Sequence, residues 1–389
     1  MDIYVVKAGD TVDTIAQSYM VSSQEIIHTN QMIPPFALVI GQALLIPTKE
    51  EYMEKPPARI NGYAYPFISN WTLRQTLPYL TELSVFSYGF TTDGNLIPPA
   101  LDDTFLIQQA YEFGTLPILT LTPFGEDGQF NNYLIHSVVQ SKEAAAELIS
   151  ELTNMVIQKG YAGVDIDFEY ILAEDRDAFT EFVRQIAEAM RSIGRQTSVA
   201  LAPKQSADQK GLLYEGKDYR GLGEAADYVL LMTYEWGYTY GPPMAVAPIF
   251  QVRKVLDYAV TEIPRDKIRL GIPNYGYDWP LPFEKGVTKA KTIGNVEAVQ
   301  IAAAYGAEIL FDERAQSPYF YYEEAGIRHE VWFEDVRSMQ AKFDLIKEYD
   351  LNGAGYWQIM QLFRANWELL EDQFEIVKEG RETLGSGNY

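Results

Sequence analysis

The chain has 389 residues, with 31 Lys plus Arg against 54 Asp plus Glu and a formal net charge of −23. This excess of negative charge repels phosphate backbones and anionic lipids, so we expect neither a nucleic acid nor a membrane as partner. The sequence has no cysteine, which excludes a disulfide framework, a thiol nucleophile and a zinc site built on thiolates. The N-terminal stretch carries no apolar run of signal-peptide length, so we expect no export signal.

The first fifty residues predict a small module with the order βααβ. A short strand is expected over 2–6, and a closing strand over 43–46 ends at Pro47. Gly9 breaks the first strand and Asp10 is placed to cap the first helix, while Ser22 or Ser23 can begin a second helix that ends near residue 30. The first helix carries one apolar stripe, formed by Val12, Ile15, Ala16 and Tyr19.

Three stretches of this module carry a family pattern: YVVKAGDTVDTIAQSY, IIHTN and GQALLIP. They make residues 1–48 resemble the LysM family. The resemblance implies binding of glycans that contain N-acetylglucosamine, such as peptidoglycan or chitin, through the loop after the first strand and the loop before the last. Those loops hold Gly9, Asp10, Thr11 and the region around Ile33. Asp10 and Thr11 are explained equally well as residues that cap a helix.

A charged, proline-containing stretch at 49–58, KEEYMEKPPA, predicts a short and fairly stiff linker. Residues 59–389 form the predicted large domain. Apolar or β-rich segments recur along it as eight candidate strands: Ile60–Ala64, Leu83–Tyr88, Leu116–Thr122, Gly163–Phe168, Thr197–Ala202, Tyr228–Tyr234, Ile268–Ile272 and Gly353–Ile359. Helical patterns lie between several of them, most clearly over 144–159 and 176–193.

Strands that alternate with helices favour a parallel sheet, and eight such units predict an α/β fold of the (β/α)8 TIM-barrel type. A doubly wound sheet is the alternative. The interval 273–352, between the seventh and eighth segments, is too long for one helix and contains strand-like stretches near 319–322 and 329–333. We expect a small α+β insertion there, over about residues 280–340.

The segment GYAGVDIDFEY at 160–170 carries the most chemical information. Side chains alternate along a strand, so Asp165, Asp167 and Glu169 share one face. An amphipathic strand with one face in water would explain this pattern without any function. The flanking helices argue against that explanation, because strands in βαβ units are covered on both faces. The sequence therefore predicts three carboxylates inside the barrel.

Three carboxylates spaced about 6.6 Å apart along one strand repel each other, so at least one of them holds a proton near neutral pH or finds partners. A carboxyl group that keeps its proton can donate it to a substrate. Catalytic groups of TIM barrels stand at the carboxyl ends of the strands, and Glu169 is the outermost of the three acids. We expect Glu169 to act as a general acid.

This strand resembles the fourth-strand signature of the family 18 glycoside hydrolases, Asp-Gly-x-Asp-x-Asp-x-Glu. Gly163, Asp165, Asp167 and Glu169 match it, and Ala162 replaces the first Asp. MTYE at 232–235 and GYWQ at 355–358 are similar to two further motifs of that family. The resemblance extends over 59–372, and the phrases MTYEWGYTYGPPMAVAPI and SPYFYYEEAGIRHEVWFED are closest to its LysM-bearing branch, which is associated with bacterial spores and cortex degradation.

The family resemblance implies a retaining mechanism in which the 2-acetamido oxygen of the substrate is the nucleophile. Glu169 would protonate the glycosidic oxygen and later activate water, Asp167 would hold the acetamido nitrogen, and Asp165 would share a proton with Asp167. Tyr234 would hydrogen-bond the acetamido oxygen, and Trp357 would form an apolar floor beneath the sugar. The resemblance implies no metal and no cofactor.

Further residues near the predicted strand ends are candidates for substrate contact: Met232, Glu235, Trp236 and Trp279. The two tryptophans follow strand ends, where an indole can stack on a sugar. Met232, Tyr234 and Trp357 would equally suit an ordinary barrel core. Glu235 stands where the family motif has Asp, so its contact is left open.

Three other signals fail a test of their spacing. GLLYEGKD at 211–218 nearly matches a phosphate-binding loop, but Asp218 stands where the magnesium-binding hydroxyl belongs. GLGEAA at 221–226 precedes a strand instead of following one, which fails the test for a dinucleotide site. DIDFEY lacks the Gly and the Glu that an EF-hand loop requires.

The leading prediction is a glycoside hydrolase that cleaves β-1,4-linked N-acetylglucosaminyl bonds in peptidoglycan, in the spore cortex or its fragments, with the LysM module as an anchor. A chitinase is one alternative, and a noncatalytic glycan-binding lectin on the same fold is another, although Glu169 favours an enzyme. A metal-dependent hydrolase lacks further ligands. We expect a monomer associated with the spore or cell wall of a bacterium. Because a short linker only tethers the module, its deletion should leave hydrolysis of soluble oligomers nearly unchanged.

Overall fold

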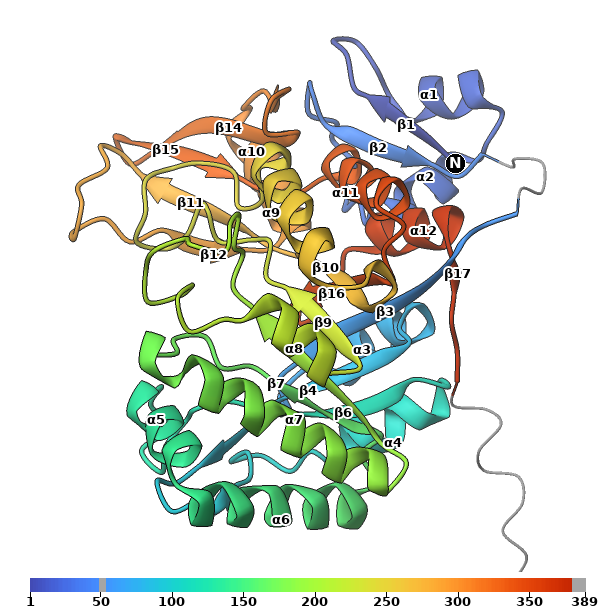
Figure 1. The fold of residues 1–389 in the computed structure, drawn as a ribbon. Helices are drawn as coiled ribbons and strands as arrows, with labels where there is room; N and C mark the ends of the chain where they lie inside the picture. Colours follow the sequence, from blue (N-terminus) through green and yellow to red (C-terminus); the bar gives the residue numbers. More distant parts are fainter. Residues whose placement is uncertain (49–53, 380–389) are drawn as a thin grey trace, which may run out of the picture.

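The computed structural model describes residues 1–48 and 54–379. Its centre is a closed barrel of eight parallel strands, which Figure 1 shows as the sheet surrounded by helices. Hydrogen bonds join them in the order β3-β4-β6-β7-β8-β9-β10-β16, and β16 pairs with β3 to close the ring. The strands are β3 Pro57–Ala64, β4 Glu82–Phe90, β6 Leu116–Leu121, β7 Gly163–Ile166, β8 Gln196–Leu201, β9 Tyr228–Leu231, β10 Ile268–Pro273 and β16 Gly353–Trp357.

Helices connect successive strands and form the outer layer. They are α3 Asn70–Thr76, α4 Thr104–Glu112, α5 Asn132–Gln140, α6 Lys142–Lys159, α7 Arg176–Ser192, α8 Tyr219–Ala225, α9 Ile249–Glu262, α11 Val336–Glu348 and α12 Arg364–Gln373. Short elements are β5 Leu96–Ile97, β17 Glu375–Ile376 and the 3₁₀ turns η1 Leu77–Tyr79, η2 Ala173–Asp175 and η3 Arg265–Lys267. The predicted TIM barrel is confirmed, and closure between β3 and β16 excludes the doubly wound alternative.

Local sequence signals explain where the main barrel helices begin and end. The Ser141 side chain accepts a hydrogen bond from the backbone N–H of Ala144 at the start of α6, and Gly160 ends that helix at a φ of 79°. Along α7, an apolar stripe buries Phe179, Phe182 and further residues against the barrel. Both helices were expected from these patterns, within two residues of their observed bounds.

The N-terminal module has the predicted βααβ order: β1 Asp2–Val5, α1 Val12–Tyr19, α2 Ser23–Thr29 and β2 Ala43–Ile46. Its first helix cap differs from the prediction. Thr11, not Asp10, caps α1, because its hydroxyl accepts from the backbone N–H of Thr14 at 3.1 Å. Asp10 instead accepts from the backbone N–H of Lys7 at 2.7 Å and from the hydroxyl of Tyr4 at 2.8 Å, which closes the turn after β1.

This module packs directly on the large domain, next to α11 and α12 (Figure 1). Leu45 belongs to the barrel's main apolar core, and Val39 is buried in a second apolar cluster with residues of the insertion. Arg364 of α12 donates to the backbone carbonyl of His28 at 2.9 Å and, from its own backbone N–H, to the Gln31 side chain at 2.6 Å. The predicted linker lies partly outside the described residues, at 49–53, and its last two residues belong to β3.

The insertion between the seventh and eighth barrel strands is an antiparallel sheet with one helix. Its elements are β11 Gly276–Pro280, β12 Lys291–Ile293, α10 Asn295–Tyr305, β13 Leu310–Asp312, β14 Ser317–Glu324 and β15 Ile327–Trp332. The strand order is β12-β11-β15-β14-β13. The α+β character matches the prediction, and the sheet begins a few residues earlier than expected because β11 follows β10 almost directly.

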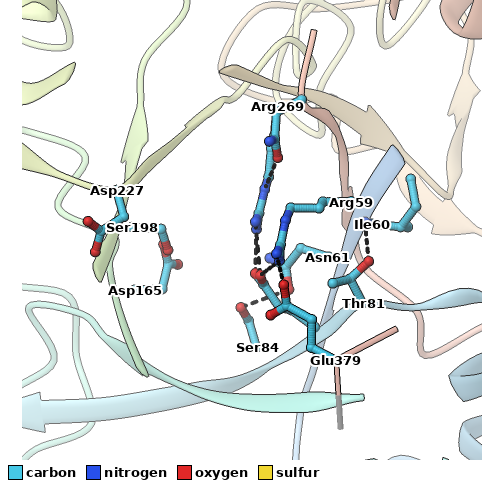
Figure 2. Close-up of polar contacts among 12 residues, drawn as sticks. Arg59, Ile60, Asn61, Thr81, Ser84, Asp165, Ser198, Asp227, Arg269 and Glu379 are labelled. Atoms are coloured by element: carbon cyan, nitrogen blue, oxygen red, sulfur yellow. Dashed lines mark hydrogen bonds and ion pairs between the residues drawn. The ribbon is translucent and has the colours of Figure 1, made fainter. Parts of the chain in front are cut away.

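Polar side chains fill the amino-terminal end of the barrel. Arg269 of β10 binds Glu82 of β4, with 2.9 Å between Nη2 and Oε1, and both residues are buried. Arg59 lies 3.6 Å from Glu82 and also binds Glu379, as Figure 2 shows. A buried charge is tolerated when it is paired and hydrogen-bonded, as here.

Within the part of the chain that the structure describes, every helix is too short or too polar to cross a lipid bilayer.

Candidate active site

The acidic segment lies at the carboxyl end of β7, the fourth strand of the barrel. The outward side chains of Val164, Ile166 and Phe168 are fully buried, and the Phe168 ring stacks on Phe179 of α7 at 5.7 Å. The backbone N–H of Asp167 donates to the carbonyl of Leu121 at 2.9 Å, so the extended pairing continues one residue beyond β7. The helix-covered face therefore leaves the acids on the inner face, as the alternation predicts.

Asp165 is the deepest of the three acids and is 1% exposed. Its Oδ1 accepts a hydrogen bond of 2.6 Å from Ser198 of β8, and its Oδ2 accepts one of 2.8 Å from Tyr63 of β3 (Figure 2 shows Ser198). Burial raises the pKa of Asp165, and the two hydroxyl donors work against that rise. Hydrogen bonds from β3 and β8 thus fix the carboxyl group of Asp165 in place.

Asp167 and Glu169 are the outer acids, and both favour the protonated form more than an exposed carboxyl does. Burial raises the pKa of Asp167 well above its usual value, and the charges of Glu169 and Asp165 raise it further. Burial also raises the pKa of Glu169. Oδ1 of Asp167 is buried and has no hydrogen-bond partner among the described residues. Both carboxyl groups therefore keep a proton to higher pH than an exposed carboxyl does, which is the direction that general acid catalysis favours.

The residues predicted to contact the substrate's reacting sugar surround these acids. Tyr234 follows β9. Burial raises the pKa of its hydroxyl, and the charges of Asp167 and Glu169 raise it further, so the hydroxyl keeps its proton. Met232 and Trp357 pack on an apolar cluster inside the barrel that contains Tyr63. The Trp357 indole is half-buried. The structure brings an acid row, a phenol donor and an indole to one end of the barrel.

Glu235 and Trp236 follow Tyr234 in the same loop. Glu235 has a φ of 68°, a left-handed conformation that is uncommon outside glycine. Its Oε1 accepts hydrogen bonds from the hydroxyls of Tyr275 and, at 2.9 Å, Tyr277. This contact answers the question that the sequence left open for Glu235. Trp236 is half-buried and packs against the main apolar core.

Trp279 does not fit its predicted role in sugar stacking. It lies in β11 of the insertion, is 0% exposed, and its indole N–H donates to the carbonyl of Gly241 at 2.8 Å. A ring without accessible surface cannot stack on a sugar. The prediction was wrong because the sequence showed that Trp279 follows a strand but not that it lies within a second sheet and packs its ring into the main apolar core.

Three residues of the site were missed by the sequence analysis. Tyr63 and Ser198 hold Asp165, and Lys217 is buried with its ammonium directed at the carbonyl of Phe168. Tyr63 and Ser198 lie on predicted strands, where alternation alone could have placed them on the inner face. Lys217 lies in a loop, and its local sequence carries no signal of that position.

The two LysM loops are placed differently from each other. The Ile33 loop forms one wall of a cavity of about 370 Å³ whose other walls come from α10 and the start of α11. The side chains of Thr11 and Asp10 make hydrogen bonds to backbone and side-chain groups of the module itself, and Gly9 allows the turn with a φ of 89°. Among residues 1–48 and 54–379, no group of three acidic or histidine side chains is arranged to hold a metal ion.

Comparison with known families decides the identity of the large domain. The model of glycosyl hydrolases family 18 matches residues 124–361, and the LysM domain model matches residues 4–47. The chain belongs to glycosyl hydrolases family 18. This family 18 chain is thus a glycoside hydrolase with an N-terminal LysM domain, which confirms the two resemblances found in the sequence.

Similar proteins of the family cover nearly the whole chain. The family 18 chain is 37% identical to a cortical fragment-lytic enzyme of Bacillus subtilis strain 168, over 97% of this chain and 99% of that protein. The crystal structure of the Bacillus cereus spore cortex-lytic enzyme SleL has a TM-score of 0.92 at 33% identity, covering 97% of this chain and 99% of that one. A chitinase from Chromobacterium violaceum has a TM-score of 0.75 at 25% identity, covering 84% and 99%.

Proposed function

We propose that this glycoside hydrolase cleaves β-1,4-linked N-acetylglucosaminyl bonds in spore cortex peptidoglycan or its fragments, with retention of configuration and with the substrate's acetamido oxygen as nucleophile. The observation that carries the proposal is the pair of outer acids: Glu169 stands at the carboxyl end of a barrel strand beside Asp167, and burial raises the pKa of both. A carboxyl group that is still protonated when substrate binds can donate its proton to a leaving alkoxide.

In the first step, the Glu169 carboxyl transfers its proton to the glycosidic oxygen while the acetamido oxygen bonds to C1 and the C1–O bond breaks. Asp167 accepts a hydrogen bond from the acetamido N–H, and its negative charge stabilises the positive oxazolinium intermediate. Asp165 takes part by sharing a proton with Asp167. In the second step, the Glu169 carboxylate removes a proton from water, which attacks C1, reopens the ring and regenerates the acetamido group.

Tyr234 and Trp357 position the reacting sugar in this scheme. Burial raises the pKa of Tyr234, so its hydroxyl remains a donor and can hold the acetamido oxygen in line with C1. The Trp357 ring makes a T-shaped contact with Phe86, with ring centroids 4.9 Å apart, and this contact fixes its orientation as an apolar floor requires. Glu235, Met232 and Trp236 complete the surroundings of that sugar.

The choice of polymer rests on the relatives and on the LysM module. Both the cortical fragment-lytic enzyme and the SleL structure match this chain over nearly its full length. A LysM module adds affinity for glycans with N-acetylglucosamine, through Gly9, Asp10, Thr11 and the Ile33 loop. We infer a monomer that is associated with the spore or cell wall of a bacterium. The likeness to a chitinase keeps chitin oligomers as the second candidate substrate.

Mass spectrometry of the products tests this proposal. Soluble cortex fragments, vegetative peptidoglycan and chitin oligomers are digested side by side, and we expect the fastest cleavage for cortex fragments, with new reducing ends at N-acetylglucosamine. Faster cleavage of chitin oligomers would support the second candidate. The acetamido nucleophile has tests of its own. Substrates without the N-acetyl group should be inert, and a thiazoline mimic of the intermediate should inhibit the enzyme. A sugar ester trapped on a carboxyl group of the protein would contradict this nucleophile.

A further inference from the structure

A buried lysine, Lys217, lies next to the acids and has no part in the chemistry proposed above. It belongs to the loop between β8 and α8 and is 0% exposed. Its Nζ donates a hydrogen bond to the backbone carbonyl of Phe168, the residue between Asp167 and Glu169. Its ammonium also lies over the Phe179 ring, 5.6 Å from the centroid. One cation thus contacts the peptide that links the two outer acids.

The loop is built to bring this cation inside. Gly216, the residue before Lys217, passes so close to the chain after the acids that a Cβ there would lie 2.4 Å from the carbonyl oxygen of Ile171. On the other side, Lys204 Nζ donates to the backbone carbonyl of Lys217 at 3.0 Å. Both contacts fix the backbone at 217, so the ammonium is held in one place instead of sampling solvent.

Burial of an ammonium group is costly unless negative charge compensates it. The charges that act on Lys217 are those of Asp167 and Glu169, whereas the neighbouring Asp218 pairs with Arg176 of α7 at 3.4 Å. Burial lowers the pKa of Lys217 to about 8, and the two acids oppose that shift. In the reverse direction, the ammonium opposes the rise in pKa of both Asp167 and Glu169. The coupling is therefore mutual.

Building on the function proposed above, we propose that Lys217 is a positioning residue that orients the Asp167–Glu169 segment and stabilises the second negative charge that appears when Glu169 gives up its proton. Before proton transfer Glu169 carries its proton, and the negative charge of the outer pair lies on Asp167. After proton transfer to the leaving sugar both are carboxylates, and the fixed ammonium lowers the energy of that state. Lys217 thereby makes Glu169 a stronger acid without touching the substrate.

Removal of this charge should change the pH profile in a defined way. Lys217→Met keeps an unbranched side chain, one heavy atom shorter, and removes the charge. Both apparent pKa values of the acid pair should therefore rise, and both limbs of the kcat profile should move to higher pH by at least about half a unit. At neutral pH we expect kcat on soluble cortex fragments to fall about tenfold or more, while KM stays within about threefold. Lys342→Met is the matched control: it removes the buried ammonium of Lys342 in α11, which pairs with Glu334 at 2.8 Å and not with the outer acids, so both limbs of its kcat profile should stay in place.

The outcomes separate the two proposals. Near-normal turnover by Glu169→Gln would remove the general acid and with it the proposed function. Unmoved limbs of the kcat profile in Lys217→Met, or a shift equal to that in Lys342→Met, would overturn the role of Lys217 alone. A second measurement does not need the Lys217 variant to fold. In the full chain with labelled lysines, the lysine that titrates near pH 8 should titrate at lower pH in Glu169→Gln, because one compensating charge is gone; an unchanged midpoint would also overturn the proposal.

Discussion

The hydroxyl of Tyr63, on the first barrel strand, donates a hydrogen bond of 2.8 Å to Oδ2 of Asp165, on the fourth. The bond crosses the barrel interior between two strands that are not neighbours in the sheet. It favours the ionised form of Asp165, which burial disfavours. The protonation of the acid row therefore depends on a residue that does not reach the scissile bond.

Tyr63→Phe tests this dependence. The variant removes one donor, so the pKa of Asp165 should rise and the acid limb of the kcat profile should move to higher pH, with a loss of roughly tenfold in kcat at neutral pH. Tyr88→Phe is a matched control, because Tyr88 is also fully buried and also donates to an aspartate, Asp103, but outside the acid row. An equal shift of the limb in both variants would contradict the role of Tyr63.

The burial of Asp167 predicts a cost in stability. Its folded-state pKa lies above its unfolded value, so the folded state binds more protons and the free energy of unfolding falls as pH rises from about 4 through the folded pKa. Each pKa unit of elevation costs about 1.4 kcal/mol above that range. Asp167→Asn should thus abolish most activity yet be more stable than wild type at pH 8, with a smaller difference at pH 5.

Urea unfolding at several pH values measures this effect. Asp177→Asn, at an exposed position of α7, is the control and should follow wild type at each pH. Two results would contradict this cost of the buried carboxylate. One is a lower free energy of unfolding for Asp167→Asn than for wild type at pH 8. The other is a difference in the free energy of unfolding between the two proteins that does not change with pH.

Two tryptophans should separate binding from stability. Trp357→Ala removes the half-buried floor and should lower kcat/KM by about 10- to 100-fold with a modest effect on stability. Trp279→Ala opens a cavity in the insertion and should cost about 3–5 kcal/mol in the free energy of unfolding, while the folded protein keeps kcat/KM within about threefold of wild type. Both quantities come from steady-state kinetics and denaturant unfolding, and a reversal of the two patterns would place the sugar on Trp279.

The packing of the LysM module changes what its deletion should do. The module buries Val39 and Leu45 against the large domain, so removing residues 1–50 exposes the apolar surface of the large domain that the module covers. We expect the truncated protein to melt lower, by on the order of 5 °C, and to be retained less on peptidoglycan particles. Val39→Asp in the full chain should reproduce the lower melting temperature, and Met20→Asp, at an exposed site of the module, should not. Unchanged melting after truncation would support a purely tethered module.

Much of this architecture follows from the sequence because its signals are local. The eight strands are short apolar segments between helical stripes, and the acids of β7 occupy alternate positions, so periodicity alone locates Asp165 and Asp167 on one inner face. The family motifs then add roles to Glu169, Tyr234 and Trp357. None of these steps requires knowledge of contacts between distant segments.

Features that depend on distant contacts could not be predicted in this way. Trp279 belongs to a sheet whose strands extend to residue 332, and its ring is buried in the main apolar core. Lys217 reaches the acids because Gly216 passes close to Ile171. The docking of the LysM module depends on α12, more than 300 residues away, where Arg364 binds the carbonyl of His28. Composition and periodicity carry no information about such pairings.

The most direct test of the central claim is the turnover of soluble cortex fragments by Glu169→Gln at the pH optimum of the wild type. The amide keeps the shape of the side chain but cannot donate a proton to the glycosidic oxygen, so we expect kcat to fall by at least about 10²-fold while the protein stays folded. Glu174→Gln, five residues along the chain in η2 and exposed, should keep wild-type turnover. Turnover by Glu169→Gln within a few-fold of wild type would contradict the assignment of Glu169 as the general acid.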